Sequence, residues 1–123
     1  MPFIINNENI DTLYKIEIYN YSDIEFSEFI KNYKNIIQSE KNKKIKIIFD
    51  ASKLTTITIK QITKLSLFLL NMKNLHKKNL EKFTIIVENN LIREIIDIVF
   101  KIIPPVRPYK IVKNIEDAYS YIL

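Results

Sequence analysis

Side chains that could do chemistry gather where an apolar run ends at Asp50 and a short polar loop leads toward a helix. Asp50 could act as a general base or as a metal ligand, and hydroxyl groups follow at Thr56 and Thr58. A carboxylate at the end of a strand commonly accepts hydrogen bonds from the amides of the next loop, here residues 52–54. We expect that structural role for Asp50 rather than catalysis.

The composition argues against several classes of site. The chain has no glycine, which a phosphate loop or a nucleophile elbow needs for its tight turns, and no cysteine for thiolate chemistry. Its one histidine, His76, lies among lysines near the end of a predicted helix, where we expect a surface residue beside the helix carbonyls. Because no nucleophile stands with a base and no metal-ligand cluster is evident, we predict no enzyme activity, no metal and no cofactor.

The net charge of +5 comes almost entirely from lysine, with Arg93 and Arg107 as the arginines. Arginine is the preferred bidentate reader of bases and phosphates, so lysines spread along the chain are more typical of a solvated surface. We therefore do not expect nucleic-acid binding.

At 123 residues, with 47% hydrophobic and 27% charged side chains, the chain has the length and composition of one folded domain, residues 1–123. No apolar run approaches the roughly 18 to 20 residues of a membrane span, and no leader pattern opens the chain. We expect a soluble cytoplasmic protein.

Apolar periodicity predicts strands that alternate with helices. Helices are expected after Ser22, after Thr58, over 90–103 and after Asn114, because serine, threonine and asparagine favour helix starts. Strands are expected over 3–5, 13–19, 45–49, 83–87 and 109–112. The order ββαβαβαβα predicts an α/β fold with a mostly parallel sheet, an antiparallel edge and packed helices. Its strand ends would bring Asp50–Thr58, Glu88–Asn90 and Lys113–Asn114 to one rim.

The segments IIFDAS, IIVENNLIREIIDIVF and NIEDAYSYIL, in this order and spacing, resemble a STAS domain. This is the fold of bacterial anti-sigma-factor antagonists and of sulfate-transporter tails, and it is similar to CRAL-TRIO lipid-exchange domains. Family members that act as phosphorylation switches carry Asp-Ser-Ser-Gly where counting from Asp50 places Thr58, Ile59, Lys60 and Gln61. Ile59 would replace the phosphorylated serine and has no hydroxyl group. The resemblance therefore implies a single, divergent STAS-like domain without the usual switch, and we expect Thr58 to be an ordinary helix cap.

The predicted helix over 90–103 is apolar around about half of its circumference, more than the roughly 100° stripe that one packed face requires. Ile96, Phe100 and Ile103 are the expected excess. We expect the segment 104–109 or the last helix to cover them; a partner or dimer patch is a second interpretation, and a lipid pocket beneath the helix, by analogy with the lipid-exchange domains, is a third.

The leading hypothesis is a non-catalytic interaction or regulatory module that binds a protein partner or a second copy of itself. The alternative is a carrier of a small apolar ligand or lipid with the same fold. The residues predicted to contact a partner are Asp50, Thr56, Thr58, Lys60, Ile96, Phe100 and Ile103.

Overall fold

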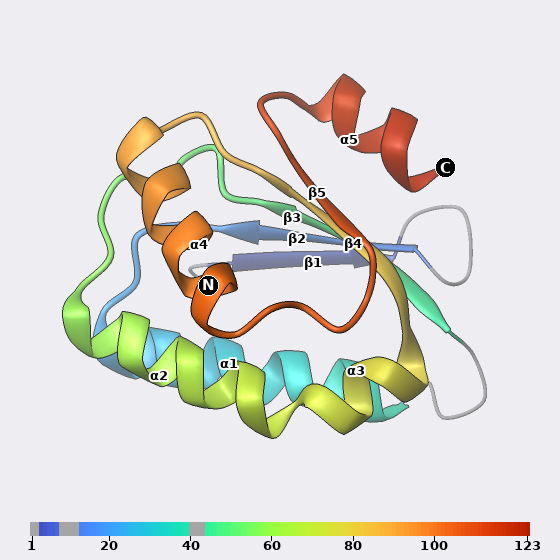
Figure 1. Cartoon of the computed structure of the whole chain (residues 1–123), viewed down its shortest axis with the longest axis horizontal. Helices are drawn as coiled ribbons and strands as arrows, with labels where there is room; N and C mark the ends of the chain where they lie inside the picture. Colours follow the sequence, from blue (N-terminus) through green and yellow to red (C-terminus); the bar gives the residue numbers. More distant parts are fainter. Residues whose placement is uncertain (1–2, 8–12, 40–43) are drawn as a thin grey trace.

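The computed structural model describes residues 3–7, 13–39 and 44–123, which form one α/β domain built on a five-stranded sheet (Figure 1). None of the helices in these ranges combines the length and the apolarity that a membrane crossing requires. The elements in chain order are β1 (Phe3–Asn7), β2 (Leu13–Ile18), α1 (Asp23–Ser39), β3 (Ile45–Asp50), α2 (Ile59–Asn71), α3 (Lys73–Asn79), β4 (Leu80–Ile86), α4 (Asn90–Ile102), β5 (Tyr109–Val112) and α5 (Ile115–Ile122).

The strands lie side by side in chain order, from β1 to β5. Strands β2, β3, β4 and β5 pair in parallel, and β1 pairs antiparallel with β2. Each parallel pair needs a crossover, which the helices supply. Ile47 of β3 lies opposite Phe83 of β4, and Phe83 lies opposite Tyr109 of β5. The predicted parallel sheet of alternating strands and helices is confirmed.

The two faces of the sheet are covered differently. Helices α1, α2, α3 and α4 lie on one face, and α5 alone covers part of the other (Figure 1). Consecutive strand residues point to opposite faces. Thus Ile47 packs in the cluster under α1–α4, whereas Ile48 packs with Val112, Ala118 and Ile122 of the α5 cluster.

Side-chain caps begin the helices where the sequence predicts them. The Ser22 hydroxyl accepts a hydrogen bond from the Glu25 amide, and the Glu25 carboxylate accepts one from the Ser22 amide. Thr58 and Gln61 form the same reciprocal capping box at α2, and Asn114 caps α5. These bonds satisfy amides that have no partner within the first helical turn.

The predicted helix after Thr58 is two helices in the structure. The helix is interrupted at Met72, which caps the end of α2 and precedes α3. The Met72 side chain is buried in the core under the helices. The next strand then begins at Leu80 rather than at Phe83. Leu80 is buried in the same core cluster, which explains why the strand starts earlier than the uninterrupted apolar run suggests.

Candidate functional site: an apolar cavity beneath α4

A cavity of about 170 Å³ lies between the helix-covered face of the sheet and the helices above it. Its sheet wall includes Phe49, Phe83 and Ile85, and α4 contributes Ile96 and Val99. The loop before α2 adds Leu54 and Ile57, and α2 adds Leu65, Phe68 and Leu69. Nearly all of these side chains are hydrocarbon, so the cavity offers an apolar environment with few competing polar groups.

The three α4 residues named as the excess of apolar surface, for which coverage by the segment 104–109 or the last helix was expected, line this cavity. Ile103 is buried, at 9% exposure, and Ile96 and Phe100 are partly buried against the core. The Phe100 ring lies 5.0 Å from the Tyr109 ring, centroid to centroid, so the segment 104–109 covers it as expected. That all three bind a partner stays a prediction, and any such contact would take place inside the cavity.

The exposed apolar side chains of α4 are a different set. Leu91, Ile98 and Ile102 are 61%, 57% and 74% exposed. When a helix is apolar around half of its circumference, more than one of its sides could pack against the sheet. The periodicity alone does not show which side is buried. The sequence pattern therefore identified the excess of apolar surface, and the structure shows that its exposed part lies at these three residues.

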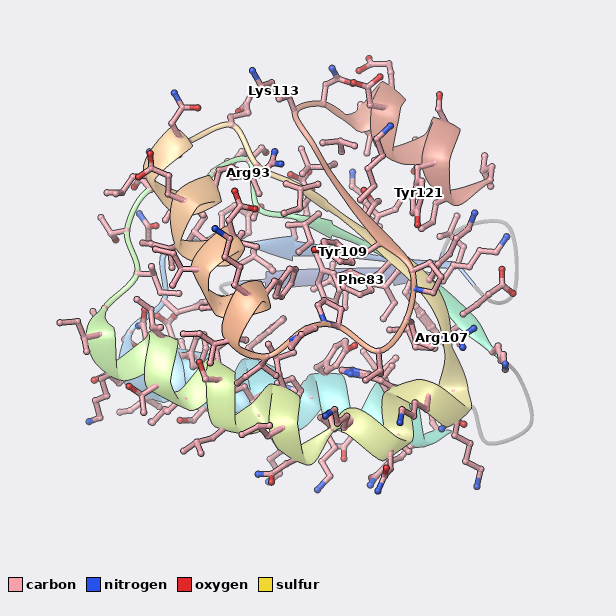
Figure 2. All side chains as sticks on the ribbon, viewed as in Figure 1. Phe83, Arg93, Arg107, Tyr109, Lys113 and Tyr121 are labelled. Carbon is pink, nitrogen blue, oxygen red and sulfur yellow. The ribbon has the colours of Figure 1, made fainter. Side chains whose placement is uncertain are left out.

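Aromatic rings line the cavity in two connected groups. Tyr33 of α1 packs against Phe49 and Phe68, with centroids 5.6 and 5.5 Å away. Figure 2 shows Phe83 of the wall beside Tyr109, which lies outside the lining, and the two rings stack at 5.5 Å. These rings are large, rigid surfaces, so the wall has a defined shape without polar contacts.

One hydrogen-bonded pair interrupts the apolar wall. The Tyr33 hydroxyl lies 2.9 Å from His76 Nε2, and both side chains are buried. Burial lowers the pKa of His76 to about 4 and raises the pKa of Tyr33, because desolvation penalises the charged form of each group. The prediction of a surface histidine was therefore wrong: His76 is a neutral residue of the cavity wall.

Two cationic side chains, Lys73 and Arg107, also line the cavity. Figure 2 labels Arg107 on the connection between α4 and β5, and its Nε donates a hydrogen bond to the Glu81 carbonyl at the start of β4, at 3.3 Å. No aspartate or glutamate of the described residues belongs to the lining. The charged part of the wall is therefore positive.

The predicted rim residues lie outside the cavity and are engaged in local structure. Asp50 accepts a hydrogen bond from the Ser52 amide at 3.1 Å, which confirms the expected turn role. Thr58 caps α2, as expected, and Lys60 forms an ion pair with Asp23 at 3.5 Å.

The remaining rim residues are also placed by the structure. The Thr56 amide donates to the Asn20 side chain at 3.2 Å, and the Thr56 side chain is exposed. Ile59, which takes the position of the phosphorylated serine in the resembling family, is 83% exposed at the start of α2. The rim and the cavity wall are thus separate groups, and binding of a partner to Asp50, Thr56, Thr58 and Lys60 stays a prediction.

The described residues contain no group of three or more histidine, cysteine, aspartate or glutamate side chains placed to hold a metal ion. The residues that sequence reasoning missed are Leu54, Ile57, Tyr33, His76, Lys73 and Arg107. Ordinary amphipathic patterning explains the apolar and aromatic members, so nothing in the sequence marked them as a site.

Comparison with known proteins supports the architecture. No protein-family model matches the chain, and neither does any curated protein. A solved structure of an uncharacterised DUF3478-family protein from Shewanella loihica PV-4, described as having a SpoIIAA-like fold, aligns with a TM-score of 0.66. The alignment covers 98% of this chain and 92% of that protein at 13% identity.

The chain has a SpoIIAA-like fold. The STAS-like resemblance is therefore confirmed as a statement about architecture. At 13% identity the likeness shows the fold alone, and one fold hosts many functions. The function of this SpoIIAA-like domain has to be argued from its own cavity.

Proposed function

We propose that this SpoIIAA-like domain is a non-catalytic binding module that holds a small apolar ligand in the cavity beneath α4. The observation that carries the proposal is the cavity itself, about 170 Å³ and lined almost entirely by hydrocarbon. An engineered apolar cavity of about 150 Å³ in another protein stays dry and binds benzene. Binding in such a cavity is favourable because the apolar ligand leaves water and gains van der Waals contacts with the wall.

The expected affinity follows from the transfer of hydrocarbon. Each buried methylene contributes about 0.8 kcal/mol. An eight-carbon chain would therefore contribute about 6 kcal/mol at full burial, part of which offsets the lost freedom of the ligand. We expect dissociation constants from about 1 mM to 50 μM for such ligands.

The polar groups in the wall support binding rather than chemistry. His76 is neutral and already hydrogen-bonded to Tyr33. A catalytic role would need a nucleophile within reach of a base, and the described residues that line the cavity include no serine, threonine or cysteine. We therefore propose no reaction for this site.

Titration with the neutral probe N-phenyl-1-naphthylamine, followed by its fluorescence, tests the proposal. The informative variant is Ile96→Trp, which fills the cavity from α4. The matched control is Ile98→Trp, two residues further along the same helix, where the side chain is 57% exposed. We expect saturable binding to the natural protein and to Ile98→Trp, displaced by octanol, and a loss of at least tenfold in Ile96→Trp. Equal binding by both variants would contradict the proposal.

A second candidate function is supported by the outer face of α4. Leu91, Ile98 and Ile102 expose apolar side chains there, as an interaction with a protein partner or a second copy requires. The test is sedimentation equilibrium of the natural protein and of Ile98→Lys. A dimer that dissociates in the variant would support self-association, and a monomer at all concentrations would exclude it.

A further inference from the structure

We infer that the cavity selects an anionic amphiphile, with an apolar chain held beneath α4 and a carboxylate or phosphate head held by Lys73 and Arg107. This inference rests on the proposed function and names the chemical class of its ligand. It depends on two cationic side chains and on the absence of an acidic neighbour in the lining, as far as the described residues show.

The guanidinium of Arg107 is anchored but not neutralised. Its Nε donates to the backbone carbonyl of Glu81, while the Glu81 carboxylate lies 3.7 Å from Lys46. Within the described part of the chain, Arg107 has no carboxylate partner. Its remaining N–H groups are the donors that bind carboxylate or phosphate oxygens in a bidentate manner.

Lys73 is the second cation of the lining and the first residue of α3. It forms no ion pair with the described residues, unlike Lys60, which pairs with Asp23, and Arg93, which pairs with Asp97. The ion pairs of the described residues involve Lys46, Lys60 and Arg93, so neither cation of the lining has a counter-ion there. An anionic head group complements this arrangement, and the apolar wall accepts the chain attached to it.

The remaining polar groups of the wall do not provide an alternative positive site. His76 is held by its hydrogen bond to Tyr33, and Tyr21 is a neutral phenol. Selection for charge would therefore come from Lys73 and Arg107, and selection for chain length from the apolar volume.

Three ligands with the same octyl chain and different heads test the inference: octanol, nonanoate and octyl phosphate. Their affinities are measured by displacement of N-phenyl-1-naphthylamine at low ionic strength. We expect nonanoate or octyl phosphate to bind about tenfold more tightly than octanol, with a preference that declines as salt is added. The tighter of the two anions identifies the head group as a carboxylate or a phosphate.

The variants Arg107→Gln and Lys73→Gln remove one cation each. We expect each to lower the affinity for the preferred anion by about threefold to tenfold, and to change the affinity for octanol by a smaller factor. Lys77→Gln is the matched control, because Lys77 is an exposed lysine of the same helix outside the lining. Octanol binding also reports that each variant retains a folded cavity.

The outcomes separate this inference from the proposed function. If octanol binds as tightly as both anions, the anionic selection is wrong and the apolar site remains. If none of the three ligands binds, the proposed function and the inference fail together. If the anions are preferred but Lys77→Gln lowers their affinity as much as the cavity variants do, general surface charge explains the effect and the assignment to Lys73 and Arg107 is wrong.

Discussion

The hydroxyl of Tyr33 lies 2.9 Å from Nε2 of His76, and this hydrogen bond joins α1 to α3 across the base of the apolar cavity. The Tyr33 ring also packs at 5.8 Å against the His76 ring. Because both side chains are buried, the pair is stable only while each group is uncharged.

Acidification should therefore destabilise the protein through His76. Its pKa is about 4 in the folded protein, against an ordinary value of 6.5. Between these values the unfolded chain binds more protons than the folded one, so the free energy of unfolding falls as pH decreases from 6.5 to 4. The loss is on the order of 3 kcal/mol.

Urea unfolding at a series of pH values measures this effect. We expect His76→Gln, which keeps a polar group beside Tyr33 but cannot be protonated, to lose less stability than the natural protein between pH 7 and pH 4.5. Parallel pH profiles for the two proteins would show that His76 does not titrate as the structure indicates.

Removal of the Tyr33 hydroxyl should lower the free energy of unfolding, although only one oxygen atom is lost. In Tyr33→Phe, His76 Nε2 remains buried without its partner, at a cost of about 1–3 kcal/mol in the free energy of unfolding. Tyr121→Phe is the control, because the Tyr121 hydroxyl makes no hydrogen bond within the described residues; we expect a change within about 0.5 kcal/mol. Equal effects of the two changes in urea unfolding would refute the special role of Tyr33.

The cap of α2 predicts a further difference between two threonines. Thr58→Ala removes the acceptor for the Gln61 amide and should lower the free energy of unfolding by about 1 kcal/mol. Thr56→Ala should have little effect, because only the backbone of Thr56 is hydrogen-bonded. Thermal unfolding compares the two, and a larger shift for Thr56→Ala would contradict the capping geometry.

The two faces of the sheet should be separable by mutation. Ile122 of α5 is fully buried on the face opposite the cavity, so Ile122→Ala should lower stability by about 2–5 kcal/mol. Binding of octanol to the folded fraction should not change. The measurement is probe displacement under conditions where circular dichroism shows a folded variant. Loss of octanol binding there would mean that the cavity depends on α5.

Local signals predicted much of the fold. The strand at Tyr109–Val112 and the cap at Asn114 were both expected, because a proline-rich connection and a capping residue bound those elements. The break at Met72 was not expected, since the apolar pattern continues through it and only packing against the core shows where the helix ends.

The site was harder to predict. His76 stands among lysines in the sequence, and its burial depends on Tyr33, 43 residues away. The wide apolar surface of α4 was evident from the sequence. Which side of α4 faces the core depends on its packing against the sheet and the 104–109 segment. A cavity forms where the side chains of several elements do not fill the space between them. Its presence therefore cannot be predicted from any one segment of the sequence.

The central claim, an apolar ligand site beneath α4, is tested most directly by isoleucine methyl NMR during a titration with octanol. Ile85 and Ile96 line the cavity, whereas Ile48 and Ile122 are buried on the opposite face of the sheet. We predict saturable shifts at Ile85 and Ile96, with Ile48 and Ile122 unmoved. The absence of saturable shifts at Ile85 and Ile96, or equal shifts on both faces, would contradict the claim.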